Sequence, residues 1–160
     1  MREDLTASSS DQSGNAPASD GAARGYLRIL IAEDDPINLK VLMAMLDSIP
    51  CDYEAVENGA EAIALLMRSP FDLVLMDNQM PVMDGITATR EIRNLDGDVG
   101  KIPIIAVTAE AMQGDRQKFL DAGMNDYVSK PVSLDRLVEA INRSTGLDAA
   151  TAAGRNSAVA

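Results

Sequence analysis

The sequence contains no histidine in its 160 residues. This absence excludes catalytic triads built on histidine, zinc sites with histidine ligands, and any phosphohistidine carried by the chain itself. The single cysteine, Cys51, cannot form a disulfide within the chain, which fits a reducing cytoplasm. We therefore interpret Cys51 as a small, buried or half-buried apolar residue.

Basic residues are scarce, and long apolar runs are absent. The 14 basic and 25 acidic residues give a net charge of −11, which repels the phosphates of nucleic acid. No apolar run approaches the ~20 residues of a membrane span, and the N-terminus lacks a signal-peptide core. We expect a cytoplasmic protein that neither binds nucleic acid nor inserts into a membrane.

The two ends of the chain differ in composition from the middle. Residues 1–25 are rich in Ser, Ala, Gly and Asp and lack apolar periodicity, and residues 144–160 are mostly Ala, Thr, Ser and Gly. We predict a disordered N-terminal tail over residues 1–25, one domain over residues 26–143, and a flexible C-terminal tail over residues 144–160. The middle segment has the usual size of a single domain.

The apolar pattern of this domain alternates between two periods. Short runs rich in branched residues predict strands, and residues at helical spacing, such as Ile37, Val41, Ala44 and Met45, predict helices. The predicted strands are 27–32, 52–57, 72–76, 102–108 and 126–129, and the predicted helices are 37–47, 60–69, 86–95, 109–123 and 133–144.

Five strands alternating with five helices predict an α/β fold, a doubly wound parallel sheet covered by helices on both faces. The second and fifth strands are half-polar, which suits the edges of the sheet. We therefore expect the flavodoxin-like strand order 2-1-3-4-5. In such a sheet, ligands bind at the C-terminal strand ends, where the strand order reverses.

Reactive side chains stand at these strand ends. The first strand leads into Glu33, Asp34 and Asp35, and the third ends at Asp77. The fourth strand ends at Thr108, and Lys130 follows the fifth. Carboxylates held close together repel one another, and an all-oxygen site without His or Cys suits Mg²⁺.

Such a site is suited to accepting phosphate. With the acids neutralised by the metal, a phosphoryl group is tolerated beside Asp77, and Lys130 and the Thr108 hydroxyl can bind its oxygens. Aspartate is an established covalent nucleophile for phosphoryl groups. Asp35 precedes Pro36 and is interpreted as a helix N-cap rather than a metal ligand, and Asp84-Gly85 as a turn that leads into a helix.

The chain from about Arg28 to Ile141 resembles the receiver domain of two-component response regulators, especially the receivers attached to hybrid sensor histidine kinases. The matching segments are "ILIAEDDPIN", "DLVLMDNQMPVMDG", "IIAVTAEAM" and "GMNDYVSKPV", in the right order and spacing. The resemblance implies a signalling domain that catalyses only its own Mg²⁺-dependent phosphorylation and dephosphorylation.

The resemblance also implies roles for individual residues. Asp77 is then the phosphoacceptor, and Mg²⁺ is held by Glu33, Asp34, Asp77 and the backbone carbonyl of Gln79. Thr108 and Lys130 contact the phosphoryl group. Tyr127 is the aromatic residue whose rotamer reports activation, Thr108 moves with it as part of the switch, and the Lys130-Pro131 bond is cis.

The implied partners are proteins. Because the chain has no histidine, the phosphoryl donor must be a separate histidine kinase or histidine phosphotransfer protein, docking near residues 37–45. A downstream partner is expected on the face formed by the fourth predicted helix, the fifth strand and the fifth helix, residues 110–141. The 17 residues after Arg143 are too few for an output domain, so we expect a free-standing receiver or one cut from a hybrid kinase.

Two alternatives share this geometry. Haloacid-dehalogenase-like phosphatases also use an aspartate nucleophile and Mg²⁺, but they place a second Asp where this chain has Gln79, which cannot transfer a proton. A pseudo-receiver would bind partners without phosphorylation, against which the intact site residues argue. The chain also departs from the commonest receiver pattern, since Glu33 replaces an Asp and the polar residues Asn78 and Gln79 follow the acceptor. The last two are expected to affect the lifetime of the phosphorylated state.

Overall fold

The computed structural model describes residues 27–109 and 113–146. The predicted N-terminal tail and most of the predicted C-terminal tail lie outside these residues, so the domain boundaries stay a prediction. The last described helix reaches Thr145, slightly beyond the predicted boundary at residue 143, and ends at Gly146 in the left-handed conformation (φ 73°).

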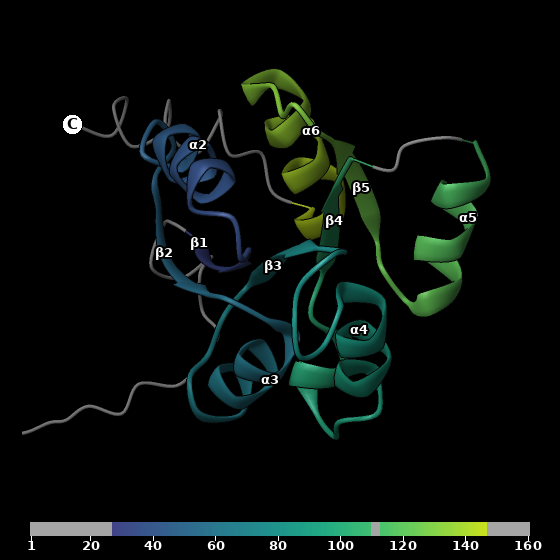
Figure 1. Cartoon of the computed structure of the whole chain (residues 1–160). Helices are drawn as coiled ribbons and strands as arrows, with labels where there is room; N and C mark the ends of the chain where they lie inside the picture. The colour runs from purple at the N-terminus through teal and green to yellow at the C-terminus, as the bar shows by residue number, and fades with distance from the viewer. Residues whose placement is uncertain (1–26, 110–112, 147–160) are drawn as a thin grey trace, which may run out of the picture.

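The predicted alternation of strands and helices is confirmed (Figure 1). Along the described chain the elements are β1 (Leu27–Ala32), α2 (Pro36–Leu46), β2 (Cys51–Val56), α3 (Gly59–Arg68), β3 (Leu73–Asp77), α4 (Gly85–Arg93), the 3-10 helix η2 (Asp98–Lys101), β4 (Ile104–Thr108), α5 (Gln113–Ala122), β5 (Asp126–Ser129) and α6 (Leu134–Thr145). The helix η2 was not predicted, and residues 110–112 of the helix predicted for 109–123 lie outside the described residues.

All neighbouring strands pair in parallel, in the order β2-β1-β3-β4-β5. This is the predicted order, with the half-polar strands β2 and β5 at the edges. The order reverses between β1 and β3, which pair from Ile29 with Leu73 to Ala32 with Met76. Both strands therefore end side by side, and the residues that follow them meet at one edge of the sheet.

Helices cover both faces of the sheet because successive strand residues point to opposite faces. On one face, Leu30 of β1 and Val74 of β3 pack in a cluster with side chains of α3, α4 and α5. On the other face, Ile29 and Leu75 pack with side chains of α2 and α6. The central strands are apolar along most of their length because both of their faces are buried, and the buried polar residues Asp77 and Thr108 stand at the ends of β3 and β4.

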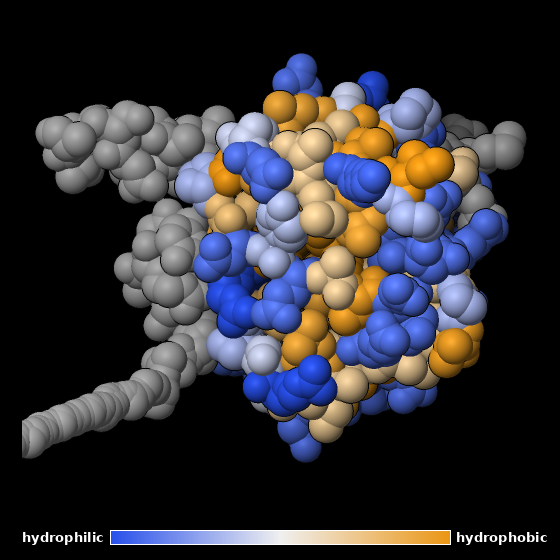
Figure 2. All heavy atoms as spheres, turned by 60° about the vertical axis from the view of Figure 1, so that its left-hand side comes forward, coloured by the Kyte–Doolittle hydropathy of each residue, from blue (hydrophilic) through white to orange (hydrophobic). Residues whose placement is uncertain are grey.

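Helix α2 forms as predicted, but its buried stripe is not the set of residues that predicted it. Leu42 and Leu46 face the sheet, whereas Ile37 is 72% exposed and Val41 is 41% exposed. Figure 2 turns the side of the molecule that carries α2 towards the viewer and shows apolar side chains among polar ones on this surface. Because α2 is apolar on most sides, periodicity alone does not determine which stripe contacts the sheet.

Side-chain caps fix where the helices near the strand ends begin. The Asp35 carboxylate accepts a hydrogen bond of 2.8 Å from the Ile37 N–H, and the Asp84 carboxylate accepts one of 2.7 Å from the Thr87 N–H. Both aspartates are therefore N-caps, as predicted for Asp35, and Asp84 leads into a helix, as predicted. None of the described helices has the length and apolar character that a bilayer crossing needs.

Candidate functional site

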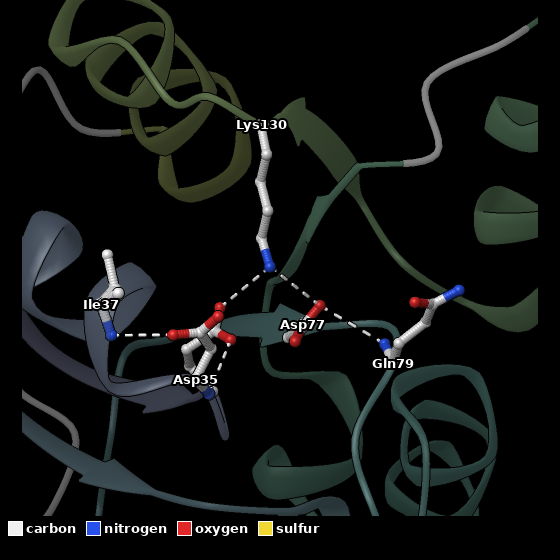
Figure 3. A network of polar contacts seen from close by, with 6 residues as sticks. Asp35, Ile37, Asp77, Gln79 and Lys130 are labelled. Carbon is white, nitrogen blue, oxygen red and sulfur yellow. Dashed lines mark hydrogen bonds and ion pairs between the residues drawn. The ribbon is translucent and has the colours of Figure 1, made fainter.

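Three segments that are distant in sequence meet at the C-terminal edge of the sheet. Glu33 directly follows β1, Asp77 is the last residue of β3, and Lys130 directly follows β5. The Lys130 ammonium lies 3.2 Å from Glu33 Oε1 and 3.3 Å from Asp77 Oδ1, so it bridges the two acids (Figure 3). The strand order therefore brings these predicted site residues together.

Three carboxylates form the acidic part of this site. Oxygens of Glu33, Asp34 and Asp77 all lie within 4.8 Å of one another, a spacing that could hold a metal ion. Glu33 is 1% exposed and Asp77 is 5% exposed, while Asp34 faces solvent. With Lys130 nearby, the ionised cluster carries a net charge of −2, which one divalent cation would neutralise. Hard oxygen ligands of this kind suit Mg²⁺.

The protein environment disfavours the ionised form of Glu33. Burial, followed by the negative charge of Asp77 and a hydrogen bond to it, raises the pKa of Glu33 to about 7. The Asp35 backbone N–H, 3.2 Å from Glu33 Oε2, and the Lys130 ammonium oppose this shift. The Glu33 Oε1 atom is buried, and its partner among the described residues is the Lys130 ammonium at 3.2 Å. This donor set fits a hard divalent cation.

The loop after Asp77 wraps around the carboxylate. The Gln79 N–H donates a hydrogen bond of 3.3 Å to Asp77 Oδ1, and the Asn78 carbonyl accepts one of 2.9 Å from the Gly85 N–H. The second bond ties the first residue of α4 to the residue that follows the acidic strand end. The backbone of Gln79, predicted to supply a metal ligand, therefore lies beside Asp77.

Val82 is the strained residue of this loop. It has a φ of +69°, and the Met83 N–H bonds to the Pro81 carbonyl at 2.6 Å across it. This is a γ-turn with positive φ, a conformation that is rare and costly for a β-branched residue. Its side chain is largely exposed, so no packing stabilises the strained backbone.

Replacing Val82 with glycine is expected to stabilise the protein by about 1 kcal/mol, because glycine adopts positive φ without steric cost. The free energy of unfolding from urea titration measures this. As a matched control, Val41→Gly in α2 is expected to destabilise by about 0.5 kcal/mol, since this exposed valine is helical. Equal losses in the two variants would show that Val82 is not strained.

Thr108 and Tyr127 lie on neighbouring strands. Ala106 and Thr108 occupy the same face of β4, and Tyr127 pairs with Ala106 and packs against the cluster on that face. The Thr108 carbonyl accepts a hydrogen bond of 2.8 Å from the Lys130 N–H, which links the end of β4 to the residue that bridges the acids. The Lys130-Pro131 bond is cis, as the resemblance implied.

Comparison with known proteins shows which family has this arrangement of residues. The response regulator receiver domain family matches residues 29–142. The chain belongs to this family. The receiver is 44% identical over 119 residues to hybrid signal transduction histidine kinase G of Dictyostelium discoideum, covering 73% of this chain. It spans only 4% of that protein's length, so the activity of the whole relative is not transferred to it.

Two solved structures extend the comparison to the fold. The receiver domain of a sensor histidine kinase from Pseudomonas aeruginosa, with a magnesium ion in its active-site cleft, has a TM-score of 0.70 and 43% identity, over 76% of this chain and 98% of that one. A Saccharomyces cerevisiae receiver domain, in complex with a histidine phosphotransfer signaling protein, has a TM-score of 0.69 and 32% identity, over 77% and 91% of the chains. The chain is thus a receiver domain of two-component phosphorelays.

One residue that supports this receiver was missed in the sequence. Arg93, at the end of α4, donates hydrogen bonds to the carbonyls of Gly123 (2.8 Å) and Gly100 (3.1 Å) and to Asn125 Oδ1 (2.9 Å). Burial lowers its pKa. Arg93 thereby ties α4 to the loop that precedes β5. Nothing in its sequence context distinguishes it from a surface arginine.

Proposed function

We propose that this receiver takes a phosphoryl group onto Asp77 from the phosphohistidine of a histidine kinase or a histidine phosphotransfer protein. One observation carries the proposal: the Asp77 carboxylate stands at the end of β3 inside a three-carboxylate cluster, 3.3 Å from the Lys130 ammonium. A cytoplasmic location is part of the proposal.

Magnesium would be held by Glu33, Asp34, Asp77 and the backbone carbonyl of Gln79. The spacing of the three carboxylates and the raised pKa of Glu33 support this set, as does the magnesium in the similar Pseudomonas aeruginosa receiver. When bound, the ion supplies positive charge that offsets the charge of the acids and of the incoming phosphoryl group.

Transfer then needs little from the protein beyond position and charge. An Asp77 carboxylate oxygen forms a bond to phosphorus as the bond between phosphorus and the donor imidazole nitrogen breaks, and the electron pair stays on that nitrogen. Lys130, already beside Asp77, turns its charge to the phosphoryl oxygens, and the Thr108 hydroxyl donates a hydrogen bond to them. Hydrolysis of the resulting acyl phosphate by water restores Asp77.

Chemical trapping tests the acceptor. The receiver is incubated with Mg²⁺ and a phosphorylated histidine phosphotransfer protein, and the product is reduced with sodium borohydride, which converts an acyl phosphate on aspartate into homoserine. Peptide mass spectrometry is expected to find homoserine at position 77 alone. Homoserine at position 34 or 35, or none at all, would overturn the assignment.

Metal binding is expected to stabilise the receiver. At a Mg²⁺ concentration about a hundredfold above the Kd, the melting temperature should rise on the order of 10 °C. Asp34→Asn should lose this increase, yet melt higher than the parent without metal because one of the crowded charges is gone. Asp52→Asn, on the exposed strand β2, is the matched control and should behave like the parent. A parent melting temperature indifferent to Mg²⁺ would contradict the metal site.

Donor docking near α2 is the second part of the proposal. Ile37 and Val41 of α2 are exposed apolar residues, and a small cavity of about 90 Å³, lined in part by Val41, Lys130 and Pro131, separates α2 from the loop after β5. Exposed apolar side chains beside a reactive site support a protein partner there. The Saccharomyces cerevisiae complex also supports a histidine phosphotransfer partner.

Phosphorylation is proposed to switch the face formed by α5, β5 and α6. New bonds from the phosphoryl group draw Thr108 towards Asp77, and Tyr127, which packs on the same face of the neighbouring strand, changes its rotamer. Amide chemical shifts with and without beryllofluoride, a phosphoryl mimic, are expected to change along α5, β5 and α6 while α3 stays unchanged. Changes limited to the neighbours of Asp77 would indicate a phosphate sink instead of a switch.

A further inference from the structure

A groove of about 720 Å³ runs along the outer strand of the sheet, between α5 and α6. Its lining includes Arg116 of α5, Tyr127 of β5, and Arg136 and Arg143 of α6. β5 ends the strand order, so its outer edge pairs with no other strand among the described residues. In Figure 1 this strand lies between the two helices. The groove thus combines an open strand edge with arginine side chains.

The arginines differ in what they already bind. Both Nε and Nη2 of Arg143 lie 2.8 Å from Asp126 Oδ2, so this guanidinium is held by a carboxylate of the groove itself. Arg116 and Arg136 are exposed, and neither side chain has a hydrogen bond or ion pair within residues 27–109 and 113–146. Two available cations therefore stand on the two helices that flank β5, in a chain with a net charge of −11.

We propose that this groove binds an extended, acidic segment of a partner protein. Arg116 and Arg136 would pair with its carboxylates from either side, and the open edge of β5 would accept its backbone as an added strand. This inference names the chemistry of the downstream partner and so rests on the proposed function of the face formed by α5, β5 and α6.

Charge complementarity favours this occupant over two others. A second copy of the chain carries the same large negative net charge, which disfavours association of two copies. Nucleic acid, with one charge on every phosphate, would be repelled by the rest of the molecule. A short acidic segment places its charge only in the groove, where the three lining guanidinium groups outnumber the carboxylates of Asp126 and Glu139.

The groove also adjoins the proposed switch. Tyr127 lines the groove and packs against the cluster that contains Ala106 of β4. A change of the Tyr127 rotamer would alter the floor of the groove without moving either arginine. Phosphorylation of Asp77 is therefore expected to change the affinity of the groove for the acidic segment, because the two sites are thermodynamically linked.

Fluorescence anisotropy with a fluorescein-labelled peptide of alternating glutamate and valine tests the inference. The full chain is expected to bind this probe, with affinity falling as salt is added, and not to bind the matched peptide of lysine and valine. The double variant Arg116→Gln/Arg136→Gln should weaken binding at least about tenfold. Arg68, another exposed arginine, lies on α3, and Arg68→Gln is the matched control that should leave binding unchanged.

Several results would overturn the inference. One is an equal loss of affinity for the probe in the double variant and in Arg68→Gln. Another is displacement of the probe by a single-stranded oligonucleotide. A third is dimerisation of the chain in sedimentation experiments that the double variant abolishes. Absence of probe binding by a receiver that phosphorylates normally at Asp77 would overturn the groove but not the proposed function. Probe binding that beryllofluoride leaves unchanged would support the groove and contradict the switch.

Discussion

Asp77→Asn is expected to abolish phosphorylation of this protein by a phosphohistidine donor. Asparagine keeps the volume of the side chain at the end of β3, but its amide is a poor nucleophile for phosphorus. Transfer of labelled phosphate should fall below detection, a loss of at least about a thousandfold, while the circular dichroism spectrum stays that of the parent. Without metal, the variant should unfold at a higher temperature, because one of the three crowded charges is removed.

The neighbouring acid supplies the control for this experiment. Asp35→Asn changes a carboxylate only two residues from Glu33, but Asp35 caps α2. Asparagine also caps helices well, so this variant should accept phosphate at close to the parent rate. Full labelling of the Asp77→Asn variant would show that a residue other than Asp77 accepts the phosphoryl group. Absence of labelling in the parent, with an active donor, would favour the pseudo-receiver alternative.

Much of the fold was predictable because the apolar pattern of each segment agrees with its place in the folded sheet. The apolar strands 27–32 and 72–76 are too short for helices and are buried on both faces, which places them in the interior of a parallel sheet. Once the strand order is predicted, the meeting of Glu33 and Asp77 follows from topology alone, because parallel strands end at the same edge. The position of Lys130 at the same edge was predictable for this reason too. Its ion pairs with both Glu33 and Asp77 were not.

What could not be predicted depends on which surfaces meet in three dimensions. Helix α2 is apolar on most sides, so only its contact with the sheet decides that Leu42 is buried and Ile37 exposed. Arg93 resembles any surface arginine until the loops carrying Gly100 and Gly123 fold against it. The positive φ of Val82 could not be predicted either, because β-branched residues rarely adopt this conformation.

A substitution at Gly85 is expected to have a large effect on stability. A Cβ added there would clash with the backbone oxygen of Asp77 and would lie 3.0 Å from Asn78 Cα and 3.0 Å from Met76 Cγ. Two of these three atoms are backbone at the end of the strand that carries the acceptor, so they cannot yield as a flexible side chain can. The Gly85 N–H also bonds to the Asn78 carbonyl, which holds α4 against this strand end.

Gly85→Ala is therefore expected to destabilise the protein by about 3 kcal/mol or more, since α4 and the end of β3 must separate to admit the methyl group. Because the same movement shifts Asp77 relative to Glu33 and Lys130, the rate of phosphorylation should fall as well, even where the variant stays folded. Urea titration gives the first quantity, and labelled phosphate transfer at low denaturant gives the second.

The matched control is Gly114→Ala, a glycine within α5 whose added Cβ would meet nothing within 4 Å. Alanine is the better helix former by about 0.5–1 kcal/mol, so this variant should be at least as stable as the parent and should phosphorylate normally. Comparing the two variants separates the effect of replacing a glycine from the effect of forcing α4 and β3 apart. If Gly85→Ala unfolded at the parent urea concentration and accepted phosphate at the parent rate, the contact between Gly85 and Asp77 would have no part in positioning the acceptor.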